Sequence, residues 1–577
     1  MGTQKLSERS LIWILACLPL FVILLLGGGS IDAPMNDEFS YARFADSLAT
    51  TGGFKLNGWG TPLMLPQLFL GATLIKLLGF KYVILHWVGL CATTPASAFL
   101  YRFLGAVQPS RSIALTLWSG IIFSSVVLSS APSFLTDVPT MALCLVAWTL
   151  FAEVMLKPGE LTSADRVKLG TGCLFALLAA LNRQNTILPF AAGMIAVAVL
   201  QPRSRSIMIP SVLLIAGTGL TLVSYFSAMP FAVPVNPIAG FLVVIGWPDI
   251  TIKFMVKFGI TMGLMVLPAA ILGLRTRKLS LLTLFVVAIW MCIFIWIPMT
   301  TQQVELFSPV FRLTMYGQYL TSLGVAVGGV HGFGSRPDIL PGLGYLWSIL
   351  GIIGTTLSTG LILSESKRLW DGIRKKERLS THQQLGVALL LFVAVQLFTM
   401  IPWLAINNMF DRYLLLLVPF ITAVHILSGG PVKRFLWMKF VAIAAVCGSI
   451  IWGIATSHEY FGYSKARMTL YEAAQAQKIA KENIDGGVEY NGDLQIVVEG
   501  HVNNRQMEPS SLFDETRHGI NVDYEAEKFP VVLATHRLST SLVLDWADSD
   551  ALAQVEWISA FPPFKRTMGL YHIGRKQ

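Results

Sequence analysis

Apolar runs of roughly 20 residues, the length an α-helix needs to cross the hydrocarbon core of a bilayer, recur along this chain from Leu11 to about residue 456. Lipid leaves a spanning backbone few options besides helices. Only 13% of the 577 residues are charged, whereas soluble proteins carry about 25%. The sequence therefore predicts a polytopic α-helical membrane protein and excludes an ordinary soluble enzyme or a nucleic-acid-binding fold.

The lysines and arginines between the runs predict how the chain is threaded. The net charge is +10, and cytoplasmic loops of membrane proteins are rich in Lys and Arg. One arrangement puts every basic cluster on the cytoplasmic side, with about 13 helices, a cytoplasmic N-terminus and an external C-terminal region. Its spans are 11–31, 82–104, 112–132, 138–156, 170–184, 186–200, 208–229, 254–274, 280–299, 345–363, 385–403, 412–429 and 436–456. Residues 62–79 then lie along the outer face or re-enter.

Two domains are expected. Residues 1–456 form the membrane module, with external loops at 32–61 and 300–344. Charged residues become frequent after residue 456, and short β-like runs appear at 494–500, 529–537 and 541–548, so that 457–577 is predicted to be a small extracytoplasmic α/β domain.

The first candidate site residues are acidic. Asp37 and Glu38 directly follow the first apolar run, and a carboxylate at the membrane surface can serve as a general base for an alcohol or amine. Asp137 opens another apolar run on the same external side. The alternative is structural: Asn36 or Asp37 caps one helix, and Thr136 or Asp137 caps the other.

The remaining candidates are basic or polar. Arg183 lies between two apolar runs, either paired with Asp137 or binding an anion such as a lipid-linked phosphate, with Gln184 beside it. Arg412 and Tyr413 open a late run, where such a pair is often only a headgroup anchor.

A glycine-rich loop adds His331 and Arg336, although a solvated histidine is the simpler interpretation. Neither a P-loop nor a dinucleotide motif is present, and metal-ligand spacing is not found. The six cysteines lie in apolar runs. We therefore expect no bound metal or other cofactor, although a divalent ion is compatible with the carboxylates.

These segments together resemble a known family. Asn36-Asp37-Glu38 resembles the Asp-Glu motif of membrane glycosyltransferases of the protein O-mannosyltransferase and lipid A aminoarabinose transferase type, in the GT-C superfamily. The segment around Asp137 is similar to the second acidic motif of that family. Asn182 to Gln184 is similar to a basic motif of bacterial members, and the run from Asp411 resembles their late Arg-Tyr-Leu segment.

The resemblance implies an inverting transfer of a sugar from a polyprenyl-phosphate donor to a lipid, glycan or protein acceptor on the outer face of the plasma membrane. It implies that Asp37 is the general base, that Glu38 positions the acceptor or the base, and that Asp137 completes the acidic site. Arg183 and Arg412 would bind the phosphate leaving group.

Two points stand against this reading. Several relatives carry a cation after the first loop where this chain has Gly58 to Pro62, so that phosphate contact would fall to Lys55 or other residues. A transporter or flippase is the main alternative, since it too has broken helices and ionisable residues near the membrane. Its site would lie at the midplane, between two related halves.

Overall fold

The computed structural model describes most of the chain. The described residues are 7–59, 63–108, 110–230, 248–274, 285–286, 288–289, 343–375, 379–405, 411–429, 436–478, 484–485, 488–500, 542–546, 553–558, 560 and 565–572. The predicted span 280–299 falls almost wholly outside them, as does the external loop 300–344, so that the number of 13 helices stays a prediction.

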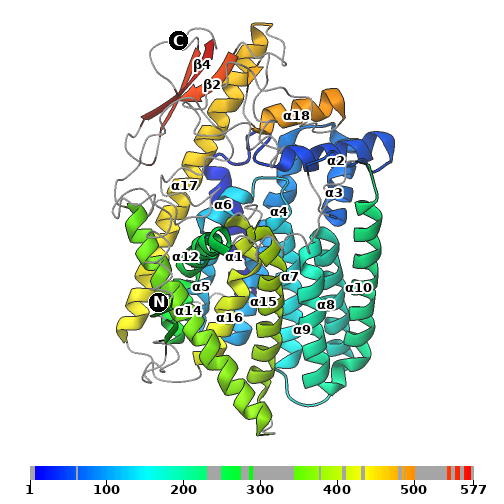
Figure 1. The fold of residues 1–577 in the computed structure, drawn as a ribbon, viewed down its shortest axis with the longest axis vertical. Coiled ribbons are helices and arrows are strands. Elements are labelled where there is room, and N and C mark those ends of the chain that lie inside the picture. The colour runs from blue at the N-terminus through cyan, green and yellow to red at the C-terminus, as the bar shows by residue number, and fades with distance from the viewer. Residues whose placement is uncertain are drawn as a thin grey trace.

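The described chain is mainly a bundle of helices (Figure 1). They are α1 (Glu8–Leu25), α2 (Glu38–Thr51), α3 (Leu65–Leu78), α4 (Tyr82–Val107), α5 (Arg111–Ile122), α6 (Ser125–Ser130), α7 (Asp137–Met155), α8 (Ser163–Asn182), α9 (Ile187–Leu200), α10 (Arg205–Ser227), α12 (Pro248–Gly273), α14 (Leu343–Arg374), α15 (Thr381–Ala405), α16 (Val418–Gly429), α17 (Leu436–Ala476) and α18 (Val488–Glu499). Short 3₁₀ turns lie between some of them: η1 (Gln184–Thr186), η2 (Pro202–Ser204) and η4 (Asp411–Leu416).

Seven helices of the described chain are long and apolar enough to cross a membrane: α1, α4, α7, α10 with η2, and the greater parts of α14, α15 and α17. α3 has 14 residues, fewer than the roughly 20 that a full span needs. The fold is thus that of a multi-pass helical membrane protein.

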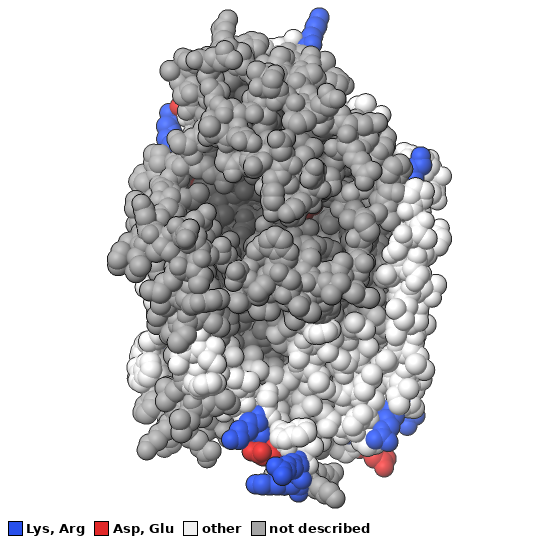
Figure 2. Space-filling model, in the orientation of Figure 1, with Lys and Arg blue, Asp and Glu red and all other residues white. Residues whose placement is uncertain are grey.

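On the face that Figure 2 shows, the coloured side chains of Lys, Arg, Asp and Glu lie in the upper part and along the lower edge, and the described atoms between these two regions are mostly white. At one end, Glu153 of α7 binds both Arg102 of α4 and Lys168 of α8. There Arg203 also donates to the carbonyl of Lys157, at 2.8 Å. Basic clusters that are far apart in sequence therefore share one end of the bundle, as a common membrane face requires.

The predicted span 112–132 is two helices rather than one. α5 ends at Ile122 and α6 begins at Ser125. Gly453 of α17 lies against the break, where a Cβ on that glycine would come 1.9 Å from the carbonyl oxygen of Phe123. A close helix contact, which only glycine permits, therefore accompanies the break. The predicted span 412–429 likewise begins as η4 before α16.

The C-terminal region begins without a break in the last bundle helix. α17 is one helix of 41 residues, and it continues through residue 456, where the two predicted domains were to meet. Residues 494–500, predicted as a strand, lie instead largely within α18, which packs on α2.

A four-stranded sheet follows, formed by β1 (Ile484–Asp485), β2 (Leu542–Trp546), β3 (Ala553–Ile558) and β4 (Lys565–His572) in the order β1-β2-β4-β3. β1 and β2 are parallel, and the other pairs are antiparallel. β2 lies within the predicted run 541–548, whereas 529–537 is outside the described residues.

Candidate functional site

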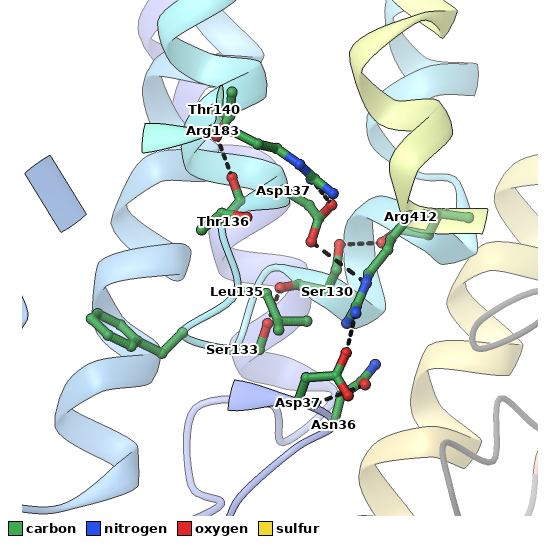
Figure 3. A network of polar contacts seen from close by, with 12 residues as sticks. Asn36, Asp37, Ser130, Ser133, Leu135, Thr136, Asp137, Thr140, Arg183 and Arg412 are labelled. Atoms are coloured by element: carbon green, nitrogen blue, oxygen red, sulfur yellow. Dashed lines mark hydrogen bonds and ion pairs between the residues drawn. The ribbon is translucent and has the colours of Figure 1, made fainter. Parts of the chain in front are cut away.

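Charged side chains from four distant segments point toward one another (Figure 3). Asp37 precedes α2, Asp137 opens α7, Arg183 follows α8, and Arg412 lies in η4. All four are therefore at the ends of helices, where the chain turns. The two aspartates and two arginines together carry no net charge.

Arg412 is at the centre of this group. Its side chain is 2% exposed and donates through Nη2 to Asp37, and its Nε lies 3.7 Å from Oδ2 of Asp137. A buried guanidinium is costly unless carboxylates compensate for its charge. Arg412 is thus held by one carboxylate from each of two distant segments, which is more than a headgroup anchor requires.

Arg183 completes the network on the other side of Asp137. Its Nη1 donates to Oδ1 of Asp137, so that this one carboxylate lies between both arginines. The ring of Tyr413 stacks on Arg183, with 4.4 Å from guanidinium carbon to ring centroid. Arg183 is 11% exposed. The expected Asp137–Arg183 pair is present, but as part of a larger network.

The three acidic residues differ in how far a substrate could reach them. The exposed fraction of the side chain is 18% for Asp37, 3% for Asp137 and zero for Glu38. Asp37 is therefore the most accessible carboxylate of the three. A general base must touch the proton that it removes, so the geometry favours Asp37 for that role.

Glu38 points away from Asp37 into the protein. It accepts hydrogen bonds from the backbone N–H of Met35 and, at 2.6 Å, from that of Phe134. His86 Nε2 of α4 lies 2.6 Å from its Oε1. Glu38 thus ties the start of α2 to α4 and to the turn before α7. These contacts fit a role in holding the turn and leave the carboxylate out of a substrate's reach.

Helix capping, the structural alternative for these segments, does not account for the side chains at the starts of α2 and α7. Asp37 is the N-cap residue of α2 and Thr136 that of α7, and neither side chain makes a capping hydrogen bond. Asn36 instead adopts a left-handed backbone conformation, with φ of 66°, and its Oδ1 accepts the N–H of Asp37. Asparagine tolerates this conformation better than most residues, and it turns the chain so that Asp37 faces Arg412.

A tyrosine hydroxyl lies near this network. Burial raises the pKa of Tyr41 well above its usual range, and the carboxylate of Asp37 raises it further. The phenol therefore stays neutral at any ordinary pH and is available as a hydrogen-bond donor near Asp37.

The other predicted residues are less involved. Gln184 Oε1 accepts the N–H of Leu63, at 3.2 Å, and so serves the backbone near α3. Lys55 is exposed in the loop after α2. His331 and Arg336 lie outside the described residues.

Two buried polar residues, His86 and Gln67, escaped the sequence analysis, whereas Asn182 was named there only as part of a motif. His86 holds Glu38 as described above. Gln67 donates to the carbonyl of Phe134, at 2.8 Å, and Asn182 donates to Thr140 Oγ1, at 2.9 Å. Gln67 thus supports the turn that precedes Asp137, and Asn182 joins the end of α8 to the first turn of α7. A histidine or glutamine inside an apolar run was the only available signal.

The arrangement suits anion binding and proton transfer rather than metal binding. In the part of the chain that the structure describes, no group of three or more His, Cys, Asp and Glu residues could hold a metal ion. The two guanidinium groups could instead bind a phosphate, and the accessible carboxylate beside them could remove a proton from a nearby hydroxyl.

No protein-family model matches the sequence, and no curated protein matches it. Among solved structures, the chain is similar to ArnT from Cupriavidus metallidurans bound to undecaprenyl phosphate, with 11% identity, coverage of 97% of this chain and 98% of that chain, and a TM-score of 0.37. It is also similar to the archaeal oligosaccharyltransferase AglB from Archaeoglobus fulgidus in complex with an inhibitory peptide and a dolichol-phosphate, with 11% identity, coverage of 94% and 70%, and a TM-score of 0.43.

Proposed function

We propose that the protein is an inverting membrane glycosyltransferase, which moves a sugar from a polyprenyl-phosphate donor to an acceptor at the outer face of the membrane. One observation carries the proposal. The residues of the four motifs that resemble GT-C enzymes, which are spread from Asp37 to Arg412, meet in a single charged cluster.

The order of exposure within the cluster supports an assignment of roles in the proposed reaction. Asp37 accepts the proton of the acceptor hydroxyl, whose oxygen attacks the anomeric carbon of the donor sugar. The bond from that carbon to the phosphate oxygen breaks on the opposite face, which inverts the anomeric configuration, and polyprenyl phosphate leaves. Asp137 is reached by both arginines, so it positions them and takes no proton.

The arginines serve the leaving group. Preorganised cations stabilise the negative charge that develops on a departing phosphate. Arg183, as the more exposed of the two, contacts the phosphate first. Arg412 then shares its charge between the phosphate and Asp37, which weakens its hold on the carboxylate and leaves Asp37 free to accept a proton.

The position of the cluster favours a transferase over a transporter. Transporter sites lie near the bilayer midplane, where helices are interrupted. Here Asp137 begins α7 and Arg183 directly follows α8, so the charges lie at helix ends. A donor whose lipid tail stays in the bilayer presents its phosphate at that level.

The experiment is a donor assay with purified protein in nanodiscs and a panel of radiolabelled polyprenyl-phosphate sugars. The wild type should release polyprenyl phosphate with at least one donor. Asp37→Asn should lower turnover by about 100-fold or more. Asp32→Asn is the matched control, because Asp32 lies in the same loop and its carboxylate accepts the N–H of Val83, which an amide oxygen can also do.

Equal turnover in wild type and Asp37→Asn would contradict the role of Asp37. Uptake or flipping of a donor without any release of polyprenyl phosphate would instead support a transporter.

A further inference from the structure

α18 follows α17, the last helix of the bundle, and packs on α2, the helix that begins directly after Asp37. Figure 1 shows α18 beside α2 at the end of the bundle, and the contacts between the two helices are direct. α2 has only 14 residues. An isolated helix of that length is marginal in water, so the position of α2 depends on what packs against it.

A two-pronged ion pair joins the helices. Arg43 of α2 donates from Nε and Nη2 to the two oxygens of Asp493, at 2.6 and 2.8 Å. Each side chain is 19% exposed. The Arg43 guanidinium also lies 4.2 Å above the ring of Phe80, and the hydroxyl of Tyr82 donates to Asp493. Bidentate pairs of this kind fix orientation as well as distance.

An apolar contact lies closer to the site. Phe39, two residues after Asp37, is fully buried, and Ile496 of α18 packs in the same cluster. Gly492 lies so close that a Cβ there would come 2.6 Å from the Phe39 ring. The ring is held from another side by Trp59, with 5.1 Å between centroids. α18 thus positions Phe39, the residue that follows Glu38.

α18 is in turn anchored to the bundle. Glu489 accepts from Arg467 of α17 at 3.0 Å, and both side chains are 4% exposed. The ring of Tyr490 packs on that of Tyr471, also from α17, with 4.3 Å between centroids. α18 is therefore a brace between α17 and α2.

We propose that Asp493 is a positioning residue, which through Arg43 and α18 holds α2 so that Asp37 faces the reacting atoms. This inference rests on the proposed function. The arginines proposed to bind phosphate lie next to α8 and in η4 rather than on α2, so loss of the brace should impair the chemical step more than donor binding.

The test compares Asp493→Asn with Asp46→Asn in the full-length protein. Asp46 is the other carboxylate partner of Arg43, at 3.3 Å, and lies on α2 itself. Both variants remove one carboxylate from the same arginine, but only Asp493→Asn weakens the brace. Gly492→Ala is a further variant, which keeps every charge and favours helix formation in α18 but crowds Phe39.

Two readouts are needed. Hydrogen exchange of the amides of α2 should be at least about 10-fold faster in Asp493→Asn and Gly492→Ala than in wild type or Asp46→Asn. The kcat should fall by about 10- to 100-fold, because small misplacements of a reacting group have effects of that size, while the donor KM stays within about twofold. The charge swap Arg43→Asp with Asp493→Arg should recover part of the kcat.

Unchanged exchange in α2 would overturn the brace, and faster exchange with an unchanged kcat would overturn its role in positioning Asp37. A wild type that turns over no donor would count against the proposed function alone. The exchange result would still decide whether α18 holds α2.

Discussion

Arg412 and Asp37 are 375 positions apart in the sequence, and the arginine side chain, 2% exposed, donates directly to the aspartate. The same guanidinium lies near Asp137. This one buried cation therefore links the beginning of α2, the beginning of α7 and the segment before α16.

Replacing Arg412 by methionine should destabilise the protein strongly. Removing one partner of a buried charge network leaves the others uncompensated, at a cost of about 3–5 kcal/mol. The variant Arg412→Met should therefore melt at a clearly lower temperature in detergent. Asp37 then lacks its hydrogen-bonded partner, whereas Asp137 keeps Arg183. Adding Asp37→Asn should therefore restore part of the melting temperature but none of the turnover, and a double variant no more stable than the single one would contradict the pairing.

Glu38 and His86 should be energetically coupled. Glu38→Gln places an amide N–H₂ where a carboxylate oxygen now accepts an N–H, at a cost of about 1–3 kcal/mol. In a double-mutant cycle with His86→Phe, we expect a coupling energy of at least about 1 kcal/mol. The control cycle pairs Glu38→Gln with Thr93→Val, whose hydroxyl bonds within α4. Additive effects in the first cycle would show that His86 does not support Glu38.

Arg183→Ala should weaken binding of the donor phosphate. Arg183 is the more exposed cation of the network, so we expect the inhibition constant of added polyprenyl phosphate to rise by about 10-fold or more, with a smaller rise for Arg183→Lys because a lysine offers no planar fork. Arg203→Ala, at the other end of the bundle, should leave the constant unchanged. A large fall in kcat with an unaltered inhibition constant would place Arg183 outside the phosphate site.

The apolar pattern predicted several helices closely. The span 138–156 corresponds to α7 at Asp137–Met155, because Asp137 and Lys157 mark both ends of the apolar run. The break inside 112–132 has no such mark. It lies where the backbone of Gly453, more than 300 residues later, meets Phe123, and a contact of that kind is invisible to local hydropathy.

The membership of the candidate site was predicted better than the roles of its residues. Counting helices by charge placed Asp37, Asp137 and Arg183 on one face, and the structure brings them together with Arg412. The roles of neighbours were harder to assign. Successive residues at a helix start differ by about 100° in direction, so Glu38 points to His86 while Asp37 points to Arg412. The β-like run 494–500 lies largely in α18 because packing on α2 and α17 outweighs the β-propensity of its valines.

A pH-dependent contribution should come from the start of α8. Lys157 and Thr162 lower the pKa of Asp165 below its ordinary value. A carboxyl whose pKa is lower in the folded than in the unfolded state contributes stability at pH values above its unfolded-state pKa, near 4. That contribution is lost as the pH falls through the folded-state pKa. The melting temperature of wild type should exceed that of Asp165→Asn by a constant amount above about pH 5, and the gap should narrow below about pH 4. A gap that widened toward low pH would contradict this assignment.

Side-specific labelling should establish the threading of the chain. In a cysteine-free background, Lys55→Cys should react with an impermeant maleimide in intact cells. Lys157→Cys should react only after the membrane is made permeable, because its region carries the basic clusters that favour the cytoplasm. Both lysines are exposed in the structure. Labelling of both in intact cells would contradict the proposed topology.

Because α17 is one unbroken helix, the number of residues in it determines where the side chains near its C-terminal end lie and in which direction they point. Its 41 residues extend about 60 Å at 1.5 Å per residue, roughly twice the hydrocarbon thickness of a bilayer. A flexible linker would absorb a residue more or less, but this rod turns by about 100° with each one. A single insertion between the bundle and Arg467 would swing that arginine, and with it α18, away from α2. The number of residues between Gly453 and Arg467 therefore determines whether α18 can reach α2, although neither residue belongs to the charged cluster around Asp37.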